Sequence, residues 1–230
     1  MRVYDISPLI SSRLGVFPGD QKFERHVVMS FAAGHHLELS RITSTLHLGA
    51  HADSPGHYSA EGGGIHAVDV RRYLGPCMVV DALHARGRRV GWQDLDDEAR
   101  EMLTSPTPRV LVRTLSFPDP EKWNSDFASF EPEFLEDLAS SGVQLVGIDT
   151  PSVDPETSKD LPAHAMLARY QMSVLEGLML GSVVQGTYVL VAAPLKIEGA
   201  DSGPCRALLL ESEIWTMDNL GEIKEVVKPS

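Results

Sequence analysis

Short apolar runs rich in β-branched residues recur along the chain and predict strands. They are too short for helices and end at polar, glycine or proline positions. The runs span residues 2–7, 24–31, 76–83, 109–115, 143–150, 187–195 and 205–210. Helical spacing predicts helices at 92–105, at 131–142, where Gly142 closes the pattern, and from near Pro162. This mixture predicts an α/β fold with a mixed sheet.

Length and composition narrow the classes of protein. A chain of 230 residues suits one large domain, expected at 1–212, with a C-terminal tail at 213–230. A formal charge of −12 argues against nucleic acid or an anionic membrane surface as partner. Neither an apolar run of about 18 residues nor the apolar core of a signal peptide is present, so a cytoplasmic location is expected. Cys77 and Cys205 show no C-x-x-C spacing, which indicates neither a disulfide framework nor a thiolate zinc site.

The candidate chemistry is concentrated in "HLGAHADSPGH", residues 47–57. If this segment is extended, alternation sends His47, His51, Asp53 and His57 to one face, and Gly49 leaves room there. A helix would align His47 with His51 but would have to accept glycine and proline. Imidazole and carboxylate groups are ligands of zinc, manganese and iron. We therefore interpret the segment as a metal site rather than a polar surface loop, with the role of His57 open between ligand and catalyst.

Two further candidate ligands, His164 and Glu176, lie in the apolar segment 161–180. Taken alone, His164 is compatible with a histidine of the core, and Glu176 with a carboxylate of the surface. Twelve residues of continuous helix would separate their Cα atoms by about 18 Å, which is too far for one metal pair whose ions lie ~3.5–4 Å apart. If both are ligands, the helix must end between them, near residues 169–173.

Two rigid turns carry further candidates. Asp149 ends a predicted strand in "GIDTPSVDP" and either supports the metal ligands or caps its turn. Phe17, on the turn "GVFPGD", is either a substrate wall or core filler. The other histidines are expected to be structural or surface residues: His26, His35, His36, His66 and His84.

Together these motifs resemble the bacterial cyclase-like metal-dependent hydrolases, whose signature is H-x-G-[TA]-H-x-D-x-P-x-H. It stands here from His47 to His57, with Ala50 in place of the commoner threonine. Within this family the chain is most similar to the kynurenine formamidase (arylformamidase) branch, through "FPGD", "GIDTPSVDP", "SKDLPAH", "LEGL" and "PLK". The likeness covers most of residues 3–210.

The resemblance implies a single domain with a central mixed, barrel-like sheet flanked by helices, of the swivelling β/β/α type. It also implies a homodimer with two metal ions per subunit, usually zinc, although manganese and cobalt accept the same donors. By this analogy His47, His51 and Asp53 hold one ion. Asp53 and Glu176 bridge to a second ion that His164 completes, and His57 is the general acid/base.

The implied reaction is hydrolysis of N-formyl-L-kynurenine to L-kynurenine and formate, in tryptophan degradation, by a metal-activated water. Phe17 stands where the family typically has tryptophan, which keeps an aromatic face but loses the indole N–H. Two alternatives remain: a hydrolase of isatin or another cyclic amide with a single manganese, and a non-catalytic metal or small-molecule binding protein on the same scaffold.

Overall fold

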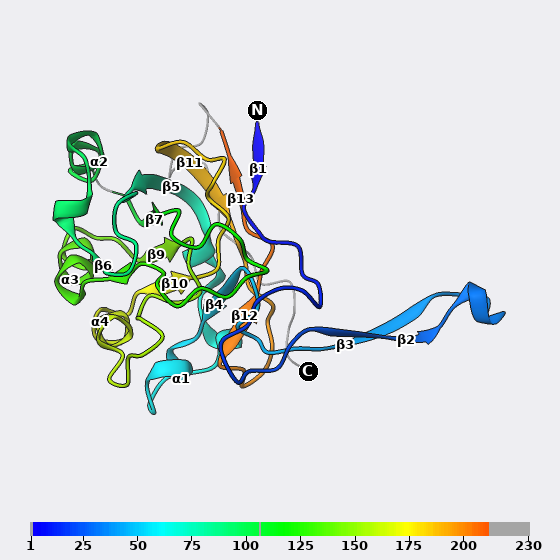
Figure 1. Ribbon diagram of the computed structural model, residues 1–230. Coiled ribbons are helices and arrows are strands. Elements are labelled where there is room, and N and C mark those ends of the chain that lie inside the picture. Colours follow the sequence, from blue (N-terminus) through cyan, green and yellow to red (C-terminus); the bar gives the residue numbers. More distant parts are fainter. Residues whose placement is uncertain (1, 106, 212–230) are drawn as a thin grey trace.

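A curved, seven-stranded mixed sheet forms the centre of the protein in the computed structural model, which describes residues 2–105 and 107–211 (Figure 1). The strand order is β1-β13-β11-β5-β7-β9-β10. Neighbours from β5 to β10 are parallel, and those from β1 to β5 are antiparallel. The strands are β1 (Val3–Asp5), β5 (Leu74–Asp81), β7 (Arg109–Arg113), β9 (Leu145–Ile148), β10 (Ser173–Leu175), β11 (Gly186–Val191) and β13 (Leu208–Leu210).

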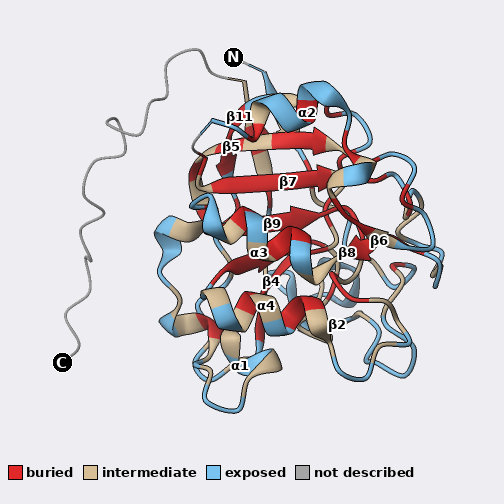
Figure 2. Cartoon of the chain, turned by 90° about the vertical axis from the view of Figure 1, so that its left-hand side faces the viewer, coloured by how far each residue is buried: buried red, intermediate tan, exposed pale blue. Residues whose placement is uncertain are grey.

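The central strands are largely buried (Figure 2), and apolar side chains cover both of their faces. Alternation along β7 sends Val110 and Val112 to the cluster under the helices and Leu111 to the cluster on the opposite face. Strands buried on both faces read as continuous apolar runs, which is why the sequence pattern identified them. The helices α2 (Asp97–Met102), α3 (Pro132–Ser140) and α4 (Pro162–Tyr170) pack against one face of the sheet (Figure 1).

Three two-stranded sheets surround this centre: β4 (His51–Asp53) with β12 (Ser202–Pro204), β2 (Glu24–Met29) with β3 (Leu39–Thr43), and β6 (Arg89–Val90) with β8 (Ser129–Phe130). The β2–β3 pair projects far from the rest of the chain as an arm (Figure 1). A short helix, α1 (Pro55–Tyr58), follows β4. Within residues 2–105 and 107–211, no helix is long and apolar enough to cross a membrane.

The predicted α/β fold with a mixed sheet is confirmed, and each of the seven predicted runs contains a strand. The predicted helix at 92–105 is instead a 3₁₀ turn at Trp92–Asp94 followed by α2. The Asp96 side chain accepts a hydrogen bond from Ala99 N and starts α2 as a separate helix. The predicted tail at 213–230 lies outside the described residues.

The extended conformation predicted through residues 47–57 is wrong except at β4. Gly49 has a φ of 62°, a left-handed conformation that bends the chain just before β4. After β4, Pro55 occupies the first turn of α1, where its fixed φ suits a helix and its missing N–H is not needed. His57 therefore reaches the other side chains from a helix and not by strand alternation.

Two backbone hydrogen bonds join β4 to the segment after β10. His51 N donates to Glu176 O at 3.2 Å, and Glu176 N donates to His51 O at 3.0 Å. The contact is very close at Gly177, whose φ is 66°, because a Cβ there would lie 2.1 Å from Gly49 O. Glycine is therefore required where the segments that carry His51 and Glu176 meet.

We expect Gly177→Ala to lower the free energy of unfolding by about 2–4 kcal/mol, because alanine meets both an unfavourable φ and a backbone clash. Urea unfolding monitored by circular dichroism measures this change. Gly181→Ala is the matched control, since Gly181 has no atom within 4 Å of an added Cβ. Equal stability of the two variants would contradict the requirement for glycine at position 177.

Candidate metal centre

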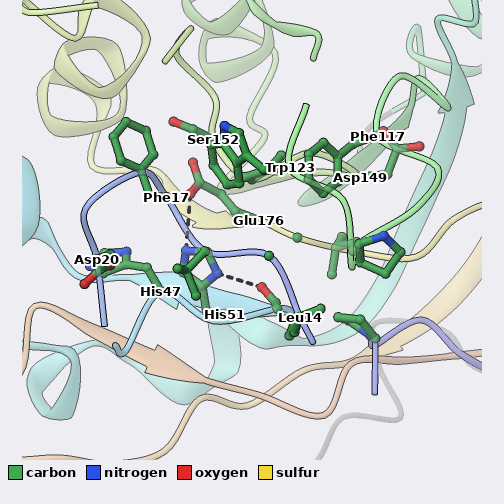
Figure 3. Close-up of a pocket in the computed structure, with 18 of the residues that line it drawn as sticks. Leu14, Phe17, Asp20, His47, His51, Phe117, Trp123, Asp149, Ser152 and Glu176 are labelled. Atoms are coloured by element: carbon green, nitrogen blue, oxygen red, sulfur yellow. Dashed lines mark hydrogen bonds and ion pairs between the residues drawn. The ribbon is translucent and has the colours of Figure 1, made fainter. Parts of the chain in front are cut away.

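The predicted site residues come together at one pocket. The cavity has a volume of about 450 Å³. Its walls include His47, His51 and Glu176 (Figure 3), together with His57 and His164. Phe17, partly exposed on its turn, also lines it. Asp53 lies beside these residues on β4 and is almost fully buried.

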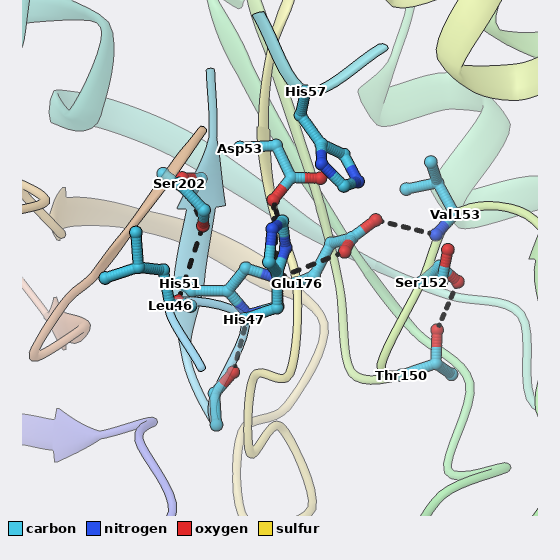
Figure 4. Close-up of polar contacts among 12 residues, drawn as sticks. Leu46, His47, His51, Asp53, His57, Thr150, Ser152, Val153, Glu176 and Ser202 are labelled. Carbon is cyan, nitrogen blue, oxygen red and sulfur yellow. Dashed lines mark hydrogen bonds and ion pairs between the residues drawn. The ribbon is translucent and has the colours of Figure 1, made fainter. Parts of the chain in front are cut away.

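Carboxylate oxygens lie between the imidazole rings (Figure 4). Asp53 Oδ1 is 3.0 Å from His47 Nδ1 and 3.4 Å from His51 Nε2, and Asp53 Oδ2 is 3.6 Å from His164 Nε2. Glu176 spans a similar gap, with Oε2 at 3.3 Å from His51 Nε2 and Oε1 at 3.7 Å from His164 Nε2. Each carboxylate thus faces two sides of the cluster with its two oxygens.

Four of the atoms that face one another here lack hydrogen-bond partners. Within the described residues, His51 Nε2, His164 Nε2 and both carboxylate oxygens of Asp53 are buried without a hydrogen bond of acceptable geometry. Leaving such groups unpartnered is costly, and sites of this kind point to a missing ligand or ion. Nitrogen and oxygen donors of this set suit zinc, manganese or cobalt, so the residues fit a metal centre.

The ligand atoms form two groups that share Asp53. Atoms of His51, Asp53 and Glu176 all lie within 4.8 Å of one another, and so do atoms of His47, Asp53 and His57. Asp53 therefore belongs to both groups. His57 is also close enough to count as a ligand by distance alone, so distance does not separate its two possible roles.

Contacts behind the ligands orient them. His51 Nδ1 lies 2.8 Å from Gly49 O, which makes that nitrogen the donor and leaves Nε2 with its lone pair toward the cluster. Glu176 Oε1 accepts a hydrogen bond of 2.8 Å from Val153 N. Such outer hydrogen bonds fix the tautomer and direction of metal-binding side chains.

Asp154 holds His164 in the same way, and the sequence analysis missed it. Its Oδ2 is 2.8 Å from His164 Nδ1, and Arg89 approaches its Oδ1 to 2.8 Å. The only signal in the sequence was its place within "GIDTPSVDP". Asp149 of the same motif instead accepts hydrogen bonds from Thr114 N and Leu115 N. It therefore holds the turn after β7, where Leu115 has a φ of 54°.

The carboxylates change the proton affinity of the histidines. Burial lowers the pKa of His164, but the hydrogen bond to Asp154 and the nearby carboxylate of Asp53 outweigh it and raise the pKa to about 10. Burial also lowers the pKa of His47, but the carboxylate of Asp53 outweighs this effect and raises the pKa to about 9. In the ion-free protein the cluster therefore holds protons where metal cations can bind, and metal binding must displace them.

The helix that begins near Pro162 ends between His164 and Glu176, as it must if both side chains bind the same pair of metal ions. α4 stops at Tyr170, and Gln171 adopts a left-handed conformation with a φ of 52°. The chain then returns through β10 to Glu176. This reversal brings Glu176 Oε1 to 3.7 Å from His164 Nε2.

Aromatic side chains form the outer wall of the pocket (Figure 3). The ring of Trp123 lies 5.5 Å from that of Phe17 and 5.8 Å from that of Phe117, both edge to face. Trp123 Nε1 donates a hydrogen bond of 2.6 Å to Glu156, which fixes the indole. Sequence analysis missed Phe117 and Trp123 because their irregular loop has no periodic pattern.

The fold and this pocket define an α/β protein whose apolar cavity ends at a buried histidine–carboxylate cluster able to hold metal ions. The family model described as "Cyclase: Putative cyclase" matches residues 4–155. The chain belongs to this family.

Known proteins resemble the chain over nearly its whole length. A kynurenine formamidase of Bordetella petrii is 41% identical over 210 residues, covering 91% of this chain and 98% of that protein. The solved structure of a potential metal-dependent hydrolase with cyclase activity is 26% identical, with a TM-score of 0.77 and coverage of 90% and 96%. An isatin hydrolase bound to thioisatinate shares the fold at 22% identity, with a TM-score of 0.73 and coverage of 90% and 91%.

Proposed function

We propose that this protein is a metal-dependent amide hydrolase that cleaves N-formyl-L-kynurenine to L-kynurenine and formate. One observation carries the proposal: buried, unpartnered ligand atoms of His51, Asp53 and His164 lie at the end of a pocket with an aromatic wall. The kynurenine formamidase of Bordetella petrii, 41% identical over 91% of this chain, supports the choice of substrate.

Two zinc ions per subunit are proposed for the cluster, with manganese or cobalt able to use the same donors. His47, His51 and Asp53 would hold one ion, and Asp53, Glu176 and His164 the other. The split of the Asp53 oxygens between the His47–His51 side and the His164 side supports a bridging role. When bound, the ions would supply Lewis-acid activation of water and of the formyl carbonyl.

His57 is proposed as the general acid/base. Its side chain is one-third exposed, unlike those of His51 and His164, and no hydrogen bond within the described residues fixes either ring nitrogen. Burial lowers the pKa of His57, which keeps its imidazole neutral and able to accept a proton near neutral pH. It would take a proton from the attacking water and deliver it to the departing aniline nitrogen.

The aromatic wall accounts for an aryl substrate. A planar ring in the cavity can pack against the wall formed by Phe17, Phe117 and Trp123, with the formyl group directed at the cluster. Trp123 supplies an indole in this pocket, although its Nε1–H is already bonded to Glu156. Phe17 is therefore proposed to act by packing alone.

The decisive experiment is a direct assay on N-formyl-L-kynurenine and on isatin, with metal content measured on the same sample. We expect formation of kynurenine and formate, no opening of isatin, and two ions per subunit. Isatin opening with a single manganese would favour the cyclic-amide alternative. Turnover of neither compound by metal-loaded protein would contradict the proposed function.

We expect His57→Ala and Asp53→Ala to fail in different ways. The first should lower kcat about 10²–10⁴-fold while metal content stays normal, because only the proton carrier is lost. The second should abolish metal binding, because Asp53 serves both ligand groups. Elemental analysis and steady-state kinetics measure both effects, with His84→Ala as the surface control. If His57→Ala instead loses its metal, and turnover is normal once metal is added to saturation, His57 is not the general acid/base.

A homodimer is also proposed, and the β2–β3 arm is the feature that supports it. Apolar side chains on the arm and its tip are exposed, among them Val27, Val28, Phe31, Leu39 and Ile42. Exposed apolar surface on a projecting two-stranded sheet with open edges usually marks an interface. A cytoplasmic location stays a prediction from the sequence.

The double substitution Val28→Asp and Ile42→Asp should convert the dimer to a monomer, because two charges would have to be buried at the interface. Size-exclusion chromatography with light scattering reports the molar mass. Val184→Asp, at an exposed apolar position outside the arm, is the control. A dimer that persists in the arm variant would show that the arm is not the interface.

A further inference from the structure

Asp201 lies directly behind the cluster because of the way β12 pairs with β4. The antiparallel register sets Ser202 opposite Asp53, and Ser54 N donates a hydrogen bond of 2.9 Å to Asp201 O. Asp201 thus stands beside the point where the chain leaves the strand that carries His51 and Asp53 and enters the helix that carries His57.

One oxygen of this carboxylate faces two imidazoles. Asp201 Oδ2 accepts a hydrogen bond of 3.0 Å from His47 Nε2, and the same oxygen lies 3.7 Å from His57 Nδ1. The two imidazole rings are themselves 4.2 Å apart between centroids. Asp201 is therefore placed to act on a proposed ligand and on the proposed proton carrier together.

The contact to His47 completes a pattern seen at the other two histidine ligands. His51 is held at its outer nitrogen by Gly49 O, and His164 is held at its outer nitrogen by Asp154. For His47 the outer nitrogen is Nε2, which leaves Nδ1, 3.0 Å from Asp53, facing the cluster. The hydrogen bond to Asp201 therefore fixes which nitrogen of His47 turns toward the cluster.

The backbone around Asp201 is anchored on both sides. Ser202 Oγ donates a hydrogen bond of 2.9 Å to Ala52 O on β4. On the other side, Ile65 N donates to Ala200 O at 2.8 Å, and Gly199 N lies 3.0 Å from His66 Nδ1. A carboxylate that is half exposed is thus held at a defined place beside the cluster, as a positioning group needs to be.

We propose that Asp201 is the positioning residue of this site: it fixes the His47 imidazole for metal binding and orients His57 for proton transfer. At 3.7 Å the Asp201 carboxylate is too far for a hydrogen bond to His57 Nδ1, but its charge favours a proton on Nδ1, which would leave Nε2 as the nitrogen that exchanges protons in the pocket. This inference rests on the metal site and the role of His57 proposed above, and it does not depend on the identity of the substrate.

Substitution of Asp201 by Ala, Asn and Glu tests this role. In Asp201→Ala we expect zinc affinity to fall 10–100-fold, measured by competition with a chelator and without any substrate. In zinc-saturated Asp201→Ala we also expect a fall in kcat with little change in KM, because substrate packing is untouched. Asp201→Glu should recover part of both properties, whereas Asp201→Asn should recover less. Glu198→Gln, at an exposed carboxylate of the same loop, is the control.

The outcomes separate this inference from the proposed function. Wild-type affinity and kcat in Asp201→Ala would overturn it. Weaker zinc binding with unchanged kcat at saturating zinc would overturn the proposed action on His57. A zinc-loaded wild-type protein that does not hydrolyse N-formyl-L-kynurenine would contradict only the substrate, since the chelator measurement still decides the role of Asp201 toward His47. A wild-type protein that binds no zinc would overturn the metal site and this inference together.

Discussion

The pair of backbone hydrogen bonds between His51 and Glu176 is the contact on which the site depends. It ties β4, which lies outside the main sheet, to the chain just after the edge strand β10. Because the bonds are antiparallel and short, the two side chains emerge side by side, and Glu176 Oε2 reaches 3.3 Å from His51 Nε2. Gly177 permits this approach, since any larger residue would collide with Gly49 O. Tight backbone packing therefore creates the cluster.

The cluster gathers buried polar groups at an electrostatic cost that a bound cation would relieve. Two carboxylates and three imidazoles are gathered with several atoms buried and unpartnered. Without ions, the carboxylates keep protons on the imidazoles, and the pKa of Asp53 falls well below its usual value despite burial. Behind the cluster, Gly49 O and the carboxylate of Asp154 satisfy the outer nitrogens of His51 and His164, and Val153 N holds one oxygen of Glu176. The inner nitrogens of both histidines and the oxygens of Asp53 are left free, which is the arrangement a metal centre needs.

The pocket is assembled from segments that are far apart in the chain. The turn at Phe17 and the loop at Trp123 supply aromatic faces, while the histidines come from β4 and its flanks and from α4. This division keeps the aromatic wall separate from the histidine–carboxylate cluster. Phe17 packs edge to face against Trp123, so the indole of the pocket comes from the second loop.

The sequence by itself determined the α/β class and the central strands, because strands buried on both faces leave local patterns. Its motif at residues 47–57 grouped His47, His51, Asp53 and His57 as one candidate site, whereas His164 and Glu176 were joined to it by the family resemblance. It also required that the helix after Pro162 end before Glu176, and α4 ends at Tyr170. The local pattern misjudged the path from His47 to His57, where Gly49 and Pro55 bend a chain that alternation treats as straight. Asp154, Asp201 and Trp123 became visible only in the tertiary structure. Their roles arise from pairing and loop packing over long separations, such as the 154 residues between His47 and Asp201, and such contacts leave no periodic signal in the chain.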